Sequence, residues 1–143
     1  MTNAVVVKGL QELFRQFDRV SKEINSGCKT LVRKITKEVA ADAKAAAPVG
    51  RGMTYKNEKT GKDELIHYKN SIKYTMSKSG LYGWAYAGKK NSNSTRGYIG
   101  HLLEYGTVKT AAIPHFFPAL EKAKRKFEPG LKAVIASVKG GKV

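Results

Sequence analysis

The sequence predicts an α+β fold: an N-terminal helical region, a small antiparallel sheet with long loops, and a C-terminal helix packed on that sheet. Three patterns support this prediction. Apolar residues recur every three or four positions over residues 10–47, apolar and polar residues alternate over 71–77 before an aromatic-rich stretch at 81–87, and a second helical stripe runs over 120–138. At 143 residues, a single domain with one modest core is expected.

The N-terminal helical region is predicted to span residues 8–47, because Pro48 cannot continue an α-helix. Asn25, Ser26 and Gly27 form its weakest point, since glycine lowers helix propensity and Asn or Ser can cap a new start. Two helices and one long kinked helix both fit this pattern. An unbroken helix would be on the order of 57 Å long, which suits a side-by-side assembly better than an isolated small domain.

The middle of the chain is predicted to hold a basic loop and a hairpin. Residues 50–64 are polar and charged, with a turn signal at 60–63, and indicate a mobile loop. Within the sheet region at 65–113, strands at 71–77 and 81–87 flank a Ser79-Gly80 turn. Residues 88–97 contain no apolar side chain and are expected to form an exposed tip.

The C-terminal helix is predicted at residues 117–138. Pro118 can occupy its first turn, where a missing N–H costs nothing. Pro129 and Gly130 are expected to kink or divide the helix. Residues 139–143 are expected to form a loose tail.

Residues 98–119 form an almost uncharged block in a chain of formal net charge +16. We therefore expect this block to be buried or to contact a partner. Glu104 is predicted to accept hydrogen bonds from the free amides of residues 106–108, a structural role that we favour over general-base chemistry. Gly106 is expected to adopt a positive φ angle.

Two adjacent aromatic residues end this block. Phe116 and Phe117, held between Pro114 and Pro118, could fill the core or anchor a neighbouring subunit. We expect at least one of the two to lie in the core.

The composition limits the possible partners and environments. The excess of positive charge favours acidic partners, and nucleic acid and acidic protein neighbours fit it equally well. No apolar run has the length of a membrane span, and the first residues do not resemble a signal peptide. A single cysteine, Cys28, fits a reducing cytoplasm. We expect a soluble protein without a membrane partner.

No pattern in the sequence indicates catalysis. His67, His101 and His115 are too far apart for a local metal-ligand pair, and the acids do not cluster as a catalytic pair would. Cys28 lies on the apolar helical stripe, which favours a core residue over a nucleophile. We therefore predict that the protein is not an enzyme and has no catalytic residues, metal or cofactor.

Four short motifs occur in a characteristic order. An alanine-rich helix end runs into a proline-valine step at 45–49, Ser71-Ile72 opens the first strand, Glu-Tyr-Gly-Thr lies at 104–107, and Pro-His-Phe-Phe-Pro-Ala lies at 114–119. Over residues 8–138 this order resembles the tail-completion or head–tail joining family of long-tailed bacteriophages. One departure is that Gly50-Arg51-Gly52 and a basic insertion replace the family's threonine-glycine-x-leucine step.

The resemblance implies a structural virion protein of the neck, assembled in the host cytoplasm. It would form a ring, expected to hold six copies, that joins the tail tube or tail terminator to the head connector, with DNA passing through the lumen. The residues expected to shape the turn or a subunit interface are Glu104, Tyr105, Gly106, Thr107, Pro114, Phe116, Phe117 and Pro118. The basic residues expected to contact partner proteins or DNA are Arg51, Lys56, Lys59, Lys62, Lys89, Lys90 and Arg96.

The alternative is a basic nucleic-acid-binding module, in which Lys and Arg loops contact phosphates and sheet aromatics stack on bases. Because alternate strand residues point to opposite faces, at least half of these aromatics are expected to be needed for the core. The aromatic residues concerned are Tyr68, Tyr74, Tyr82, Trp84 and Tyr86.

Overall fold

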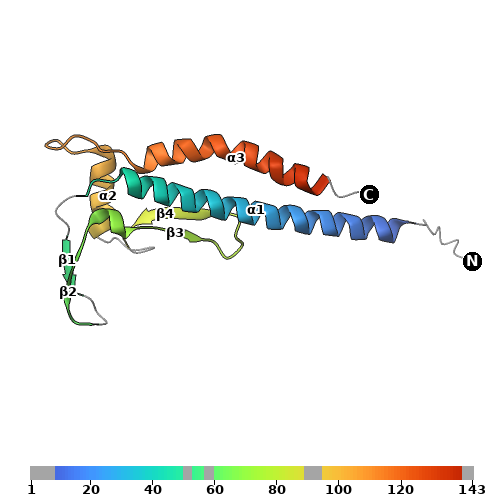
Figure 1. The fold of residues 1–143 in the computed structure, drawn as a ribbon, viewed down its shortest axis with the longest axis horizontal. Helices are drawn as coiled ribbons and strands as arrows, with labels where there is room; N and C mark the ends of the chain where they lie inside the picture. Colours follow the sequence, from blue (N-terminus) through green and yellow to red (C-terminus); the bar gives the residue numbers. More distant parts are fainter. Residues whose placement is uncertain (1–8, 50–52, 57–59, 89–94, 140–143) are drawn as a thin grey trace, which may run out of the picture.

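The computed structural model describes residues 9–49, 53–56, 60–88 and 95–139 (Figure 1). The α+β prediction is confirmed. The long helix α1 (Leu10–Ala46) lies between the C-terminal helix α3 (Phe116–Lys139) and a hairpin of β3 (Ile72–Met76) and β4 (Gly83–Ala87). No helix in the described ranges is both long and apolar enough to cross a membrane.

The predicted N-terminal helical region is one undivided helix of 37 residues. At its suspected weak point, Gly27, α3 packs tightly against it, because a Cβ atom there would lie 2.5 Å from Cγ1 of Val134. The contact is reciprocal, since a Cβ atom on Gly130 would lie 2.6 Å from Cδ1 of Leu31. Each helix therefore uses a glycine to admit a branched side chain of the other.

Ion pairs accompany this packing further along the two helices. Lys122 pairs with Asp42 at 2.9 Å, and Lys126 pairs with Glu38 at 2.8 Å. All four side chains are at least a third exposed, so these pairs orient the helices more than they stabilise them.

The β3–β4 hairpin and its Ser79-Gly80 turn are confirmed. The strands pair antiparallel from Ile72 opposite Ala87 to Met76 opposite Gly83. Their inner face approaches α1 so closely that a Cβ atom on Gly83 would lie 2.8 Å from Oγ1 of Thr36.

The expectation that at least half of the candidate aromatics belong to the core is wrong. Tyr68 is buried, but it lies in a short 3-10 turn, η1 (Tyr68–Ser71), and not in the sheet. Tyr74, Tyr82 and Trp84 are exposed. For Trp84 the physical reason is the strand register: it lies on the face opposite Ile72, Met76 and Gly83, and Gly83 is the residue that approaches α1.

The predicted basic loop at 50–64 contains a second hairpin. β1 (Met53–Lys56) pairs antiparallel with β2 (Asp63–Ile66), and Gly61 has a φ of 67° in the connection between them. Figure 1 shows this hairpin standing away from the α1–α3 pair. The sequence did not predict these strands because each has only four residues within a charged segment, too short a run to stand out as a periodic pattern.

A helix that the sequence did not predict precedes the linker to α3. α2 (Thr95–Tyr105) covers the end of the expected tip at 88–97 and the start of the uncharged block, so this part of the predicted sheet region at 65–113 is helical. Residues 89–94 of the expected tip lie outside the described residues. Gly100 weakens the helical signal, but its missing side chain is required because a Cβ atom there would lie 2.6 Å from the Tyr68 hydroxyl.

The C-terminal helix begins one residue before the prediction, with Pro118 in its first turn as expected. Pro129 lies inside α3 and does not divide it, and the helix is arched in Figure 1. α3 packs mainly along α1 and reaches the hairpin at one edge, where Leu120 and Phe127 share a 220 Å³ cavity with Ala85.

The core lies where the C-terminal end of α1 meets η1, α2 and the start of α3. Its buried members are three alanines, one tyrosine and one isoleucine, and partly buried apolar residues surround them. The buried residues are Ala43, Ala47, Tyr68, Ile72 and Ala119, and the surrounding residues are Val39, Ala87, Ile99, Leu103 and Phe116.

Candidate functional site

Glu104, in the last turn of α2, organises the junction between α2 and α3. Its Oε2 atom accepts the backbone N–H groups of His115 at 2.9 Å and Phe116 at 3.0 Å, and its Oε1 atom accepts that of Phe117 at 2.7 Å. These donors belong to the first turn of α3, where backbone N–H groups have no partner within the helix. Glu104 therefore caps α3 from another helix.

This result corrects the partners predicted for Glu104. A carboxylate that binds free backbone amides was expected, but at residues 106–108 and not at 115–117. Burial raises the pKa of Glu104, yet the three backbone N–H donors outweigh it and hold that pKa below its usual value. The carboxylate is thus ionised at neutral pH, as a cap on a helix N-terminus requires.

His115 lies beneath this cap and is fully buried. Its Nδ1 atom is 2.9 Å from the Ile113 carbonyl oxygen and 3.2 Å from Oε2 of Glu104, so the hydrogen-bond network assigns a proton to Nδ1. The Tyr68 hydroxyl then donates to Nε2 at 2.8 Å. Burial, together with the charge of Glu104, raises the pKa of Tyr68 to about 12, so Tyr68 remains a phenol.

This buried polar network was not predicted from the sequence. The histidines were considered as metal ligands, and Tyr68 as one of the sheet aromatics that divide between base stacking and the core. One signal was present: His115 follows a proline inside an uncharged block, where a lone polar side chain needs an internal partner. Within the described parts of the chain, no cluster of three or more His, Cys, Asp or Glu residues could hold a metal ion.

The linker from α2 to α3 is a stiff, hydrogen-bonded loop. Gly106 has the expected positive φ, at 76°, and a Cβ atom there would lie 2.8 Å from the backbone nitrogen of Ala112. Thr107 and Thr110 exchange backbone hydrogen bonds of 2.8 and 3.3 Å, and the two tip residues between them, Val108 and Lys109, are exposed, Val108 at 105%. The loop therefore projects an apolar side chain in a defined position.

The aromatic residues of the uncharged block divide between core and surface. Phe116 packs against the core, which confirms that at least one of the two phenylalanines lies there. Phe117 and Tyr105 are exposed. Pro114 and Pro118 are also exposed, at the start of α3.

The basic residues predicted as partner contacts are mostly not placed by the structure. Lys62 is exposed beside the β1–β2 connection. Only the backbone of Lys56 and Arg96 is described, in β1 and α2. The others lie outside the described residues: Arg51, Lys59, Lys89 and Lys90.

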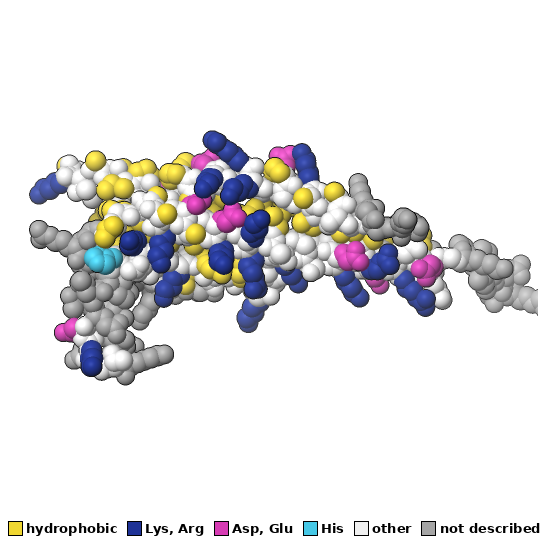
Figure 2. All heavy atoms as spheres, in the orientation of Figure 1, with side chains coloured by type: hydrophobic (Ala, Val, Ile, Leu, Met, Phe, Trp, Pro, Cys, Tyr) yellow, Lys and Arg dark blue, Asp and Glu magenta, His cyan; other side chains and the backbone are white. Residues whose placement is uncertain are grey.

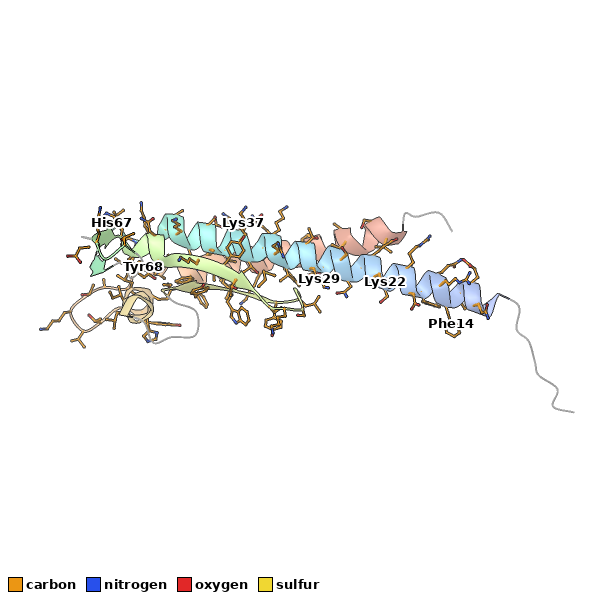
Figure 3. The ribbon with its side chains drawn as sticks, turned by 90° about the horizontal axis from the view of Figure 1, so that it is seen from below. Phe14, Lys22, Lys29, Lys37, His67 and Tyr68 are labelled. Carbon is orange, nitrogen blue, oxygen red and sulfur yellow. The ribbon has the colours of Figure 1, made fainter. Side chains whose placement is uncertain are left out.

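A basic row on α1 was not singled out by the sequence analysis. Five exposed bases follow one another at steps of seven, four, four and seven residues, which places them on one side of the helix. Figure 3 labels three of them along α1, and Figure 2 shows Lys and Arg side chains distributed along the molecule. The row consists of Lys22, Lys29, Arg33, Lys37 and Lys44.

These features are those of an assembly subunit: a small α+β fold whose central polar network joins two helices, with apolar and basic side chains left at the surface. A family model described as "Bacteriophage HK97-gp10, putative tail-component" matches residues 11–106, and the chain belongs to this HK97-gp10-like family. It is thus a bacteriophage tail component, a protein of the virion that interacts with other virion proteins. Comparison with curated proteins and with solved structures finds no match.

Proposed function

We propose that this tail component is a neck protein, a subunit of the ring that completes the tail and joins the tail tube to the head connector. The observation that carries the proposal is the stiff loop at 106–113, which displays Val108 beside the Glu-Tyr-Gly-Thr motif. An apolar residue held out by a rigid turn is suited to contact another subunit, because little conformational entropy is lost on docking.

A ring also needs elongated subunits that pack side by side. α1 spans 37 residues, on the order of 55 Å, and gives the molecule its length. We propose a ring of six copies that is assembled in the host cytoplasm, with the tail-tube or terminator protein on one side and the connector on the other. DNA would pass through the lumen.

We further propose that the protein has a structural and not a catalytic role. Both oxygens of Glu104 are engaged by backbone N–H groups, and its lowered pKa makes it a weak general base. Both ring nitrogens of His115 have partners inside the fold. Neither group has a free position for a substrate in this arrangement.

Electron microscopy of the purified chain with the tail tubes of the same virus tests this proposal. Light scattering first gives the oligomeric state of the free chain. We expect rings that cap the tubes, and we expect Glu104→Gln to reduce capping because it disturbs the loop. Glu121→Gln, at a partly exposed site on α3 where the side chain pairs with Lys124 of the same helix, is the matched control. A chain that neither oligomerises nor caps tubes would rule out the neck assignment.

Nucleic-acid binding is a second candidate function, favoured by the basic row on α1. From Lys22 to Lys44 the row extends over roughly 33 Å, comparable to one turn of duplex DNA. The outer face of the β3–β4 hairpin also exposes aromatic rings, with Tyr82 and Trp84 in edge-to-face contact at 5.1 Å.

Salt dependence separates this candidate from a purely structural role. In a gel-shift titration with short duplex and single-stranded DNA, five phosphate contacts would give a slope of log K against log salt of about −4.5 on duplex DNA. Replacing Lys29, Arg33 and Lys37 by Gln should remove more than half of that slope. Absence of binding by the monomer at moderate salt would exclude this candidate.

A further inference from the structure

The first turns of α1 carry large apolar side chains that the described part of the chain does not cover. Phe17 is 62% exposed, and three neighbours on the same side of the helix are also exposed. Figures 1 and 3 show that this end of α1 extends beyond the end of α3 and beyond the β3–β4 hairpin, with Phe14 near its extremity. The neighbours are Leu13, Phe14 and Val20.

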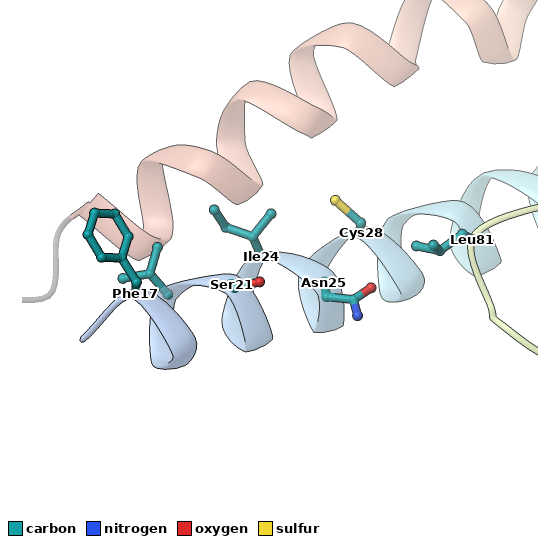
Figure 4. A pocket seen from close by; sticks show the side chains of 7 residues that line it. Phe17, Ser21, Ile24, Asn25, Cys28 and Leu81 are labelled. Atoms are coloured by element: carbon teal, nitrogen blue, oxygen red, sulfur yellow. The ribbon is translucent and has the colours of Figure 1, made fainter. Parts of the chain in front are cut away.

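An open groove of about 450 Å³ continues this apolar surface toward the middle of the molecule. Figure 4 shows Phe17, Ile24 and Cys28 in succession along one side of α1, with Leu81 of the β3–β4 turn at one end. Such a volume can hold several side chains. Phe17 and Leu81 are themselves exposed, so the groove is accessible.

The opposite end of the molecule presents a shape that complements this groove. The turn at 107–110 projects Val108, and exposed Tyr105 and Phe117 lie near the two ends of the linker that carries it. The loop is held by Gly106 and by a 2.7 Å hydrogen bond from the Ile113 N–H to the Leu103 carbonyl. One end thus carries an apolar groove, and the other projects the apolar side chain of Val108 beside the exposed Lys109.

Charge indicates that the occupant of the groove is a second copy of this chain. Self-association of a +16 protein is opposed by repulsion unless the contacting surfaces are neutral. Residues 11–28 hold three acids and three bases, and residues 98–119 hold one of each, so neither segment contributes to the net charge. These two neutral segments carry the groove and the loop.

We infer that the Val108 loop of one copy docks into the α1 groove of the next copy. This inference rests on the proposed ring function and specifies its subunit contact. The contact is heterologous, with different surfaces on the two copies, and such contacts close into a ring when the rotation between copies permits. Pairing of two grooves would instead end at a dimer and leave Val108 exposed.

The native cysteine in the groove allows a direct test. Val108→Cys places a second thiol on the loop, and Cys28 lies in the groove wall, about 27 Å of helix before the end of α1. Treatment with a short bis-maleimide, with and without tail tubes, should link residue 28 of one copy to residue 108 of another, as found by mass spectrometry. Lys132→Cys, at an exposed site on α3, should give no such link.

The outcomes of this cross-linking are distinct. Links of 28 to 28 or of 108 to 108 alone would mean that like surfaces meet, which contradicts the inference. Rings without any 28–108 link would also overturn it, while the neck function would stand. If the wild-type chain neither forms rings nor caps tubes, the proposed function itself fails.

Complementation between two variants provides a second test. Phe17→Glu places a charge in the groove, and Val108→Glu places a charge on the loop. Neither change should unfold the chain, because both side chains are exposed. Each variant alone should fail to form rings. Mixed, they should form 1:1 dimers through the one intact groove and the one intact loop, as measured by light scattering and by cross-linking on tubes. Persistent rings of either variant would contradict the docking contact.

Discussion

Glu104 and His115 are joined twice. The backbone N–H of His115 donates to Oε2 of Glu104 at 2.9 Å, and Nδ1 of its ring lies 3.2 Å from the same oxygen. Because Glu104 lies in the last turn of α2 and His115 directly precedes α3, this pair fixes both ends of the intervening loop. The position of Val108, on which subunit contact is proposed to depend, therefore depends on a carboxylate that does not touch it.

Glu104→Gln should destabilise the fold by about 1–3 kcal/mol, because the amide NH₂ group cannot accept the backbone hydrogen bonds that the second carboxylate oxygen accepts. Urea unfolding followed by circular dichroism measures this loss. Glu121→Gln, which removes an exposed pair with Lys124, should change stability by less than about 0.5 kcal/mol. Equal effects of the two substitutions would contradict the capping role.

The same carboxylate should make stability fall in acid. Since the pKa of Glu104 is lowered in the folded state, its contribution is complete above its unfolded pKa, about 4.3, and is lost as pH falls through the lower folded value. The urea midpoint of the wild type should therefore fall more steeply below about pH 4.3 than that of Glu104→Gln.

A matched variant controls for other acids in this acid titration. A hydrogen bond from Lys126 lowers the pKa of Glu38, so Glu38 has the same sign of effect, but its pair is exposed and contributes less. Glu38→Gln should keep most of the wild-type slope. Parallel curves for the wild type and Glu104→Gln would show that Glu104 is not responsible for the acid sensitivity.

A structural element can be predicted from the sequence when the residues that determine it lie within the element itself. Pro48 follows the end of one helix and Pro118 lies in the first turn of another because of their own ring geometry, so these features were predicted. The β3–β4 hairpin was predicted from the alternating residues of β3 and the Ser79-Gly80 turn, which are also local. The partners of Glu104 lie 11 to 13 residues away and meet it only because the chain folds back.

Two glycines also have roles that depend on residues far away in the sequence and so cannot be predicted from local propensity. Gly27 reads as a helix breaker in the sequence, but its role depends on Val134, which lies on another helix. Similarly, Gly100 weakens the helical signal of α2, but glycine is needed there because Tyr68 occupies the space that a side chain would fill. Local propensity cannot distinguish a glycine that ends a helix from one that admits a neighbour.

Gly27→Ala should therefore destabilise the protein, although alanine favours an isolated helix by about 1 kcal/mol. The new methyl group would lie 2.5 Å from Cγ1 of Val134, and overpacking of this kind costs about 1–3 kcal/mol. Ser26→Ala, one residue earlier and exposed, should be neutral or slightly stabilising. Urea midpoints of the three proteins give the comparison.

A double variant tests the cause of this loss. Val134→Ala removes the methyl groups that Gly27→Ala would strike, so the combination should be more stable than the sum of the two single changes. Additive effects would mean that the loss does not come from a clash between residue 27 and Val134.

Two glycines with similar backbone angles separate conformational strain from close packing. Gly106 and Gly61 have φ angles of 76° and 67°, so an alanine at either position pays about 1–2 kcal/mol for the left-handed conformation. A Cβ atom on Gly61 meets nothing within 4 Å, whereas one on Gly106 meets backbone atoms of Thr110 and Ala112. Gly106→Ala should therefore cost about 1–2 kcal/mol more than Gly61→Ala in urea unfolding, since backbone cannot move aside as a side chain can. The new methyl group would displace the loop backbone at Thr110 and Ala112 and so shift Val108. Gly106→Ala should therefore reduce tube capping, whereas Gly61→Ala should leave it unchanged. Equal capping by both variants would show that the loop need not be rigid.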